Sequence, residues 1–191
     1  MFESAIDLID EANKEDPNSE VFEGQTYPKE LLYSQRMTTW LAKLAPDASE
    51  ALQLAARSQH IGRWEISRAS YPQDRVGYLQ WRKDLGKFHA ETAGDILKAV
   101  GYDDDTIQRV QSLLRKERLK TDPETQTLEN VICLVFLENY FTNFAKEQDE
   151  AKIIGIIQKT WKKMSPRGHE AALQLDLPDE ARVLVEMALA E

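Results

Sequence analysis

The chain has 191 residues, of which 42% are hydrophobic, and it carries a formal net charge of −9 at pH 7. The surplus of negative charge argues against duplex DNA or an anionic membrane as the main partner, because both repel an acidic surface. No apolar run reaches the roughly 18 residues of a transmembrane helix, and the N-terminal segment lacks the basic region of a signal peptide. We therefore expect a cytoplasmic protein.

Helical periodicity runs through almost the whole chain, beginning with apolar residues from Phe2 to Ala12. The longest helix is expected to end at Gly101, because glycine is favoured just after a helix. Pro123 suits the first turn of the most apolar helix. The expected helices cover about 2–12, 30–44, 47–60, 74–100, 103–115, 124–144, 150–163, 166–175 and 178–191.

Two of the segments between these helices are long. The stretch "DPNSEVFEGQTYPKE", residues 16–30, is expected to form a loop because it contains proline, asparagine and glycine. The stretch "GRWEISRASYPQD", residues 62–74, is expected to be an ordered loop. No segment alternates as a strand does. The predicted fold class is all-α, a single-domain helical bundle over 1–191, with C-terminal helices at about 150–190 packed on its core.

Positive charge gathers in one short belt of this acidic chain. Residues 57–87 hold 7 basic and 3 acidic side chains, whereas residues 1–56 hold 4 basic and 11 acidic ones. The belt either attracts a small anion such as a phosphate group or forms a solvated, arginine-rich surface. A third interpretation is RNA binding through its interleaved aromatic residues, which the net charge disfavours.

Two histidines are candidates for a site. His89 shares a helical stripe with Trp81 and Leu85, so its ring should face inward, either as a core residue or as a ligand. His60 closes a helix, where a histidine also gains from the helix dipole.

The apolar helix 124–144 carries two acidic residues, Glu129 and Glu138. They lie nine positions apart and so point to opposite sides of the helix, and at most one can join a single site. Glu138 is the more informative of the two, because apolar neighbours make a carboxylate costly to bury there. Glu129 lies near the helix start and is kept as the alternative acid. The one cysteine, Cys133, is expected to be a small buried side chain.

The stretch "YSQRMTTWLAKLAPDASEALQLAARSQHIGR" resembles the opening of HD-domain metal-dependent phosphohydrolases. Gln59 stands where that superfamily has the histidine of its His–Asp pair, and His60 stands where it has the aspartate. Tyr33 replaces the opening histidine. The similarity continues in "FHAETAGDILKAVGYDDDTIQRVQSLL" and in "ICLVFLENYF". It covers about residues 30–145 and implies an HD-like core with extra N- and C-terminal helices.

This resemblance implies a divalent metal ion (Mn, Fe, Zn or Mg) held by His60, His89 and Glu138. Such an ion would lower the pKa of a bound water and supply hydroxide for attack on a small phosphorylated or nucleotide-like substrate. Arginines suit bidentate phosphate contacts, and tryptophans can stack on a base or simply pack. The candidate substrate-binding residues are Arg63, Trp64, Arg68, Arg75 and Trp81.

A second resemblance spans nearly the whole chain. The segments "PKELLYSQRMTTWL", "QHIGRWEISRASYP", "KFHAE", "CLVFLENYF" and "WKKMSPRGHEAALQL" look like the hallmarks of an uncharacterised family that is catalogued only as a domain of unknown function. It implies no activity.

The sequence thus leaves two main hypotheses. The first is a metal-dependent phosphohydrolase. The second is a non-catalytic HD-like helical domain that binds a small anionic ligand or a protein partner. The candidate partners are a small phosphorylated ligand and a second copy of the chain in a homo-dimer, with neither nucleic acid nor a membrane expected.

Overall fold

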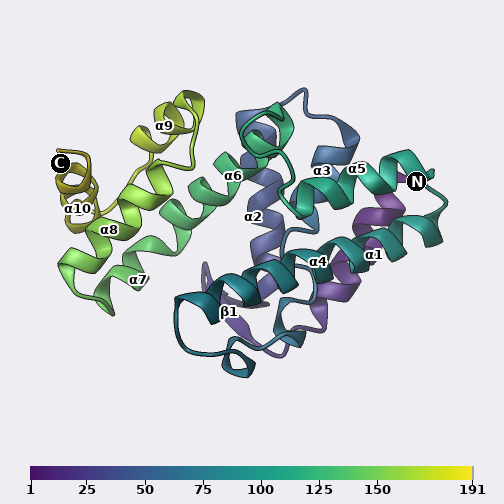
Figure 1. The fold of residues 1–191 in the computed structure, drawn as a ribbon, viewed down its shortest axis with the longest axis horizontal. Helices are drawn as coiled ribbons and strands as arrows, with labels where there is room; N and C mark the ends of the chain where they lie inside the picture. Colours follow the sequence, from purple (N-terminus) through teal and green to yellow (C-terminus); the bar gives the residue numbers. More distant parts are fainter. Residues whose placement is uncertain (191) are drawn as a thin grey trace. The chain divides into compact units, whose positions relative to one another are not determined.

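The computed structural model describes residues 1–190, and the chain divides into two compact units. The N-terminal unit comprises Met1–Thr125 and the C-terminal unit Gln126–Glu191. Both are built mainly of helices, which confirms the helical fold class (Figure 1). The division falls at 125/126, inside the segment that the sequence assigns to a common core.

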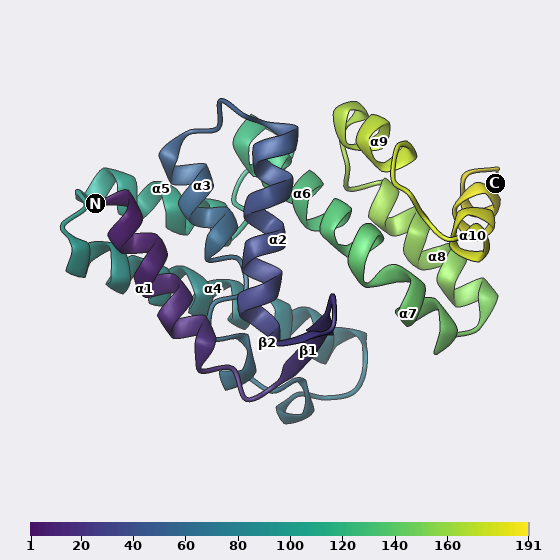
Figure 2. The same ribbon diagram turned by 180° about the vertical axis from the view of Figure 1, so that it is seen from behind.

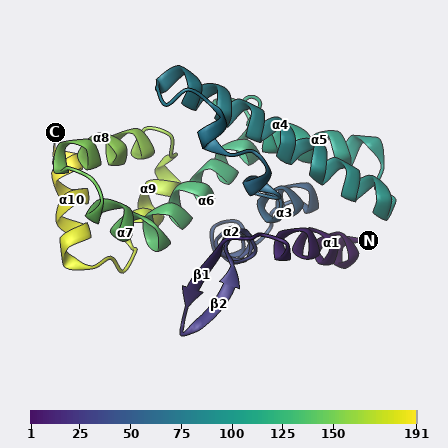
Figure 3. The same cartoon turned by 90° about the horizontal axis from the view of Figure 1, so that it is seen from below.

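The N-terminal unit is a cluster of packed helices. Helix α1 packs on three other helices, α3 packs on α2 and α5, and α4 runs beside α5 (Figures 1 and 3). Fully buried apolar side chains such as Ile9, Met37, Leu54 and Leu113 fill the space between them. The helices are α1 (Phe2–Lys14), α2 (Lys29–Leu44), α3 (Glu50–Arg57), α4 (Arg75–Val100), α5 (Asp104–Leu114) and the start of α6 (Pro123–Asn139).

Local chemistry sets several of these boundaries. Gly101 ends α4 with φ +98°, a left-handed conformation that side chains with a Cβ rarely adopt. The Asp103 carboxylate then accepts a hydrogen bond from the Thr106 amide and so caps α5. Helix α3 is shorter than expected, because residues 58–62 leave the helix in tight turns and Gly62 adopts φ +62°. The loop 62–74 is ordered, as expected, and contains two short 3-10 helices, Arg63–Glu65 and Arg68–Ser70.

The expectation of a loop over residues 16–30 is wrong. Strands β1 (Ser19–Phe22) and β2 (Gln25–Pro28) pair as an antiparallel hairpin beside α2 (Figures 2 and 3). Glu23 and Gly24 both have positive φ, which is typical of the tight two-residue turn that matches strand twist. The Arg36 guanidinium of α2 binds the Glu20 carboxylate at 2.6 Å and lies over the Phe22 ring. A side chain of another element therefore contacts both an acid and an aromatic ring of the hairpin.

The C-terminal unit contains the remainder of α6 and four more helices among the residues described. The expected helix 124–144 divides at Tyr140, where the backbone leaves helical geometry. Cys133 is buried and its thiol lies 3.9 Å from the Thr160 carbonyl oxygen, as expected for a small core side chain. Helix α10 packs on α7 and α8. The helices are α7 (Phe141–Lys146), α8 (Glu150–Trp161), α9 (Pro166–Leu173) and α10 (Asp179–Ala190). None of the helices within residues 1–190 is long and apolar enough to cross a lipid bilayer.

Candidate functional site

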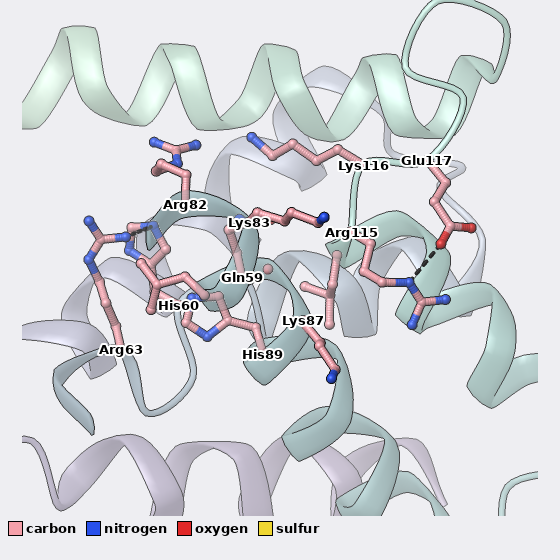
Figure 4. A pocket seen from close by; sticks show the side chains of 13 residues that line it. Gln59, His60, Arg63, Arg82, Lys83, Lys87, His89, Arg115, Lys116 and Glu117 are labelled. Atoms are coloured by element: carbon pink, nitrogen blue, oxygen red, sulfur yellow. Dashed lines mark hydrogen bonds and ion pairs between the residues drawn. The ribbon is translucent and has the colours of Figure 1, made fainter. Parts of the chain in front are cut away.

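A cavity of about 500 Å³ lies within the N-terminal unit (Figure 4). Three segments far apart in the sequence form its wall: the turn after α3, the middle of α4 and the turn after α5. We call this cavity the cationic pocket. Its lining residues are Gln59, His60, Arg63, Arg82, Lys83, Leu85, Gly86, Lys87, His89, Leu114, Arg115, Lys116 and Glu117.

Cationic side chains dominate this lining. Six of the lining residues within the described chain are lysine or arginine, and Glu117 is the one acid among them. The Glu117 carboxylate accepts a 2.7 Å hydrogen bond from Arg115 Nε, so it already has a cationic partner (Figure 4). In a protein with a net charge of −9, such a local surplus of positive charge creates a field that favours an anion.

His60 lies at the pocket wall between an acid and a cation. Its Nδ1 is 3.0 Å from Glu30 Oε2, and its Nε2 is 3.1 Å from Arg63 Nη1. Because a guanidinium only donates hydrogen bonds, Nε2 must accept and the ring proton must sit on Nδ1, facing Glu30. The ring also stacks on Tyr33 at 3.9 Å. His60 is therefore held in one orientation and one tautomer.

The pKa values of His60 and Glu30 are shifted in opposite directions. Burial, reinforced by Arg63 and Arg82, holds the pKa of His60 well below its usual value. Burial also raises the pKa of Glu30 from 4.5 to about 7, although Arg63 acts against the shift. At neutral pH His60 is thus an uncharged hydrogen-bonding group, and Glu30 is near the midpoint of its titration.

His89 lies beside His60, with ring centroids 6.0 Å apart. Burial and the neighbouring His60 lower its pKa to about 3, so the ring is neutral. Its Nδ1 is 2.8 Å from the Ile61 carbonyl oxygen, which can only accept, so Nδ1 carries the proton. Its Nε2 is a buried acceptor without a hydrogen-bond partner among the residues described. The sequence prediction that His89 faces inward is confirmed by a side chain only 3% exposed.

The structure places the sequence-predicted belt residues in different surroundings. Arg63 lines the cationic pocket and lies over the Trp81 ring at 4.9 Å, but Trp81 itself is buried and donates its indole N–H to the Ile66 carbonyl. Arg68 donates to the carbonyl oxygens of Tyr71 and Asp74 and so holds the loop. Two other candidates lie outside the pocket lining, the half-buried Trp64 and the exposed Arg75 at the start of α4.

The two candidate acids belong to the C-terminal unit, whereas both histidines belong to the N-terminal unit. Glu138, the acid named as a metal-ligand candidate, has an exposed side chain that accepts a hydrogen bond from Asn139. Glu129 is the buried acid, with Lys163 Nζ 3.9 Å from its carboxylate. Residues 1–190 contain no group of three or more His, Cys, Asp or Glu side chains arranged to hold a metal ion.

The family model described as "Domain of unknown function (DUF4202)" matches residues 3–185. The chain belongs to this family. Comparison with curated proteins and with solved structures gave no match.

Sequence reasoning missed several residues of the pocket in this DUF4202 chain. In the α4 segment "RKDLGKFH", Lys83 and Lys87 are four residues apart. Arg82, Gly86 and His89 repeat at helical spacing too and so fall on one face. That pattern was available from the sequence. Glu30 and Lys116 carried no such signal, because each reaches the site through tertiary packing from a distant segment.

Proposed function

We propose that the cationic pocket binds a small phosphorylated ligand. The surplus of lysine and arginine in its lining carries the proposal. Arginine and lysine recognise phosphate by charge-assisted hydrogen bonds, and a partly enclosed site strengthens them by excluding water. The volume of about 500 Å³ lies within the range of small-molecule sites in proteins.

The two neutral imidazoles support this proposal. Their pKa values are low because burial and the surrounding cations penalise a further positive charge. A bound anion would supply the missing negative charge and raise the pKa of His60 in particular, since His60 touches Arg63 and lines the pocket. Anion binding and proton uptake are therefore coupled at this site.

Calorimetric titration with pyrophosphate tests the proposal directly. Arg82→Gln and Lys83→Gln should each weaken binding roughly tenfold, which is the loss of one charge-assisted hydrogen bond. Lys98→Gln is the matched control, because Lys98 is an exposed lysine of the same helix outside the pocket lining. Absence of binding at millimolar pyrophosphate, or equal affinity in all three variants, would overturn the proposal.

A specific observation favours a second candidate, the metal-dependent phosphohydrolase with an HD-like core. His60 and His89 both direct Nδ1–H to an oxygen acceptor and keep Nε2 as the acceptor, although Nε2 of His60 is 3.1 Å from the Arg63 guanidinium, which a metal ion would have to displace. Histidines that bind metals adopt this arrangement, because the outer hydrogen bond fixes the ring. A bound ion would supply a water of lowered pKa there. Two imidazole nitrogens are fewer than the three protein ligands usual in catalytic zinc sites, so anion binding has the stronger support.

Metal analysis of the purified protein tests this second candidate. A stoichiometric ion that is lost in both His60→Ala and His89→Ala supports it. A folded, metal-free protein without phosphatase activity in added Mn²⁺, Mg²⁺ or Zn²⁺ rejects it. Pyrophosphate binding under the same metal-free conditions would leave the first proposal standing.

A further inference from the structure

We infer that the ligand of the cationic pocket is a hydroxylated, non-aromatic molecule with at least two phosphoryl groups, of the sugar bisphosphate class. This inference rests on the proposed phosphate-binding function and narrows it to a ligand class. Three properties of the lining lead to it: the distribution of the cations, the absence of an aromatic surface among the described lining residues, and two buried acceptors.

The cations come from all three segments of the wall. Arg63 follows α3, Arg82 and Lys83 lie on α4, and Lys116 follows α5 (Figure 4). A single phosphate has one compact set of oxygens and can engage only part of such a lining. The cavity of about 500 Å³ has room for a larger molecule. A ligand with phosphoryl groups at two ends of a small scaffold would use cations from different segments.

The described lining offers no flat aromatic surface for a nucleobase. It contains no Phe, Tyr or Trp, and its apolar part consists of Leu85 and Leu114. The nearby indole of Trp81 is covered by Arg63 and fixed by its bond to the Ile66 carbonyl. One face of the His60 ring is already occupied by Tyr33. Base stacking supplies much of the affinity in many nucleotide sites, so these surroundings favour a scaffold without a base.

Two buried acceptors in the lining need donors. Gln59 Oε1 and His89 Nε2 have no hydrogen-bond partner among residues 1–190, and the two residues are 6% and 3% exposed. A buried acceptor left unpaired costs about 1–3 kcal/mol. Fully ionised phosphate has no hydrogen to donate, whereas a hydroxyl has one. Both residues line the pocket, so a ligand hydroxyl satisfies either acceptor when the side chain turns toward the cavity on binding.

Calorimetric titration with three probes tests the inference: fructose 1,6-bisphosphate, hexane-1,6-diol bisphosphate and ADP. The first two carry a phosphate at each end of a six-carbon skeleton, but only the sugar, as a furanose ring, bears hydroxyl groups. ADP brings two phosphoryl groups with a base. We expect fructose 1,6-bisphosphate to bind at least tenfold more tightly than either of the others. Equal affinity of the two bisphosphates, or tighter binding of ADP, would overturn the inference while phosphate binding stood. Failure of all three, and of pyrophosphate, would defeat the proposed function itself.

A variant identifies the hydroxyl contact. Gln59→Met keeps the size of the side chain and removes the acceptor, so it should weaken fructose 1,6-bisphosphate roughly tenfold and leave hexanediol bisphosphate unchanged. His89→Gln, which keeps an acceptor at the second position, should retain the preference for the hydroxylated probe if Gln59 is intact. A preference that survives unchanged in Gln59→Met and in a Gln59→Met/His89→Phe double variant would contradict the assignment.

Discussion

The contacts around His60 show how single residues combine into a site. Glu30 is a buried acid whose carboxylate faces His60 Nδ1 at 3.0 Å and lies 3.7 Å from Arg63 Nε. Burial disfavours its charged form more strongly than Arg63 favours it, so its pKa is raised to about 7. The cluster therefore changes its charge near neutral pH, at the wall of a pocket lined with cations.

This raised pKa predicts a loss of stability with rising pH. Between the ordinary value of 4.5 and about 7, the unfolded chain gives up the Glu30 proton while the folded chain keeps it. The free energy of unfolding should then fall by about 3 kcal/mol over that window, from the shift of the pKa. His60 and His89 act in the opposite sense, since their lowered pKa values remove stability as pH falls below 6.5.

Glu30→Gln isolates the contribution of the acid, because the variant retains both histidines. Urea denaturation between pH 4.5 and 7.5 measures the free energy of unfolding of both proteins. The variant's value minus that of the natural protein should grow by about 3 kcal/mol between pH 4.5 and pH 7, because only the natural protein loses stability there. The difference should then stay constant. Parallel curves over the whole range would show that Glu30 is not the group that titrates.

Some of these residues could be predicted from the sequence and others could not. His89 was predicted to face inward because it continues an apolar helical stripe, and Arg63 was predicted because it belongs to a visible cationic belt. Arg68 belongs to the same belt, but its guanidinium is used by backbone carbonyls, a role that charge counting cannot distinguish. Glu30 lies 30 residues before His60, so their contact exists only in the folded chain.

At the scale of elements, local signals predicted helices well. Gly101 and Pro123 mark a helix end and a helix start as expected, because their backbone preferences hold in any surroundings. The hairpin was missed because its strands have four residues each and because Arg36, which contacts it, lies on another element. Tertiary contacts of that kind leave no periodic pattern in a sequence.

A polar contact of defined geometry joins helix α1 to two other helices of the N-terminal unit. Arg57 of α3 donates from Nε and Nη2 to the two oxygens of Asp10 at 2.7 and 2.6 Å, and from Nη1 to Thr38 of α2 at 3.2 Å. Arg57 is 9% exposed. Three helices thus meet at a single buried guanidinium, which needs its carboxylate to offset the cost of burial.

Asp10→Asn should therefore destabilise the protein by about 3 kcal/mol, because it leaves a buried cation without its counter-charge. Asp7→Asn on the same helix is the control. Asp7 is exposed, so its replacement should change the free energy of unfolding by less than about 0.5 kcal/mol. The measurement is urea denaturation at neutral pH. A similar small change in both variants would mean that the Asp10–Arg57 contact contributes little.

At the scale of the whole molecule, positive charge is concentrated in one part of an acidic chain. The chain carries a net charge of −9, yet the lining of the cationic pocket is strongly basic. Every lining residue belongs to the N-terminal unit, between Gln59 and Glu117. The composition of the chain indicated an acidic protein, but it could not indicate that distant cations converge, since convergence depends on how α3, α4 and α5 pack.

This distribution predicts where ligand binding will stabilise the molecule. A ligand at 100 times its dissociation constant adds about 2.7 kcal/mol to the stability of the state that binds it. Amide hydrogen exchange of the full chain with saturating fructose 1,6-bisphosphate or pyrophosphate should therefore slow in α3, α4 and α5, whose packing forms the pocket. Exchange in α8 and α10 should stay unchanged, because these helices belong to the other compact unit. Protection centred on α8 and α10 would place the ligand outside the cationic pocket.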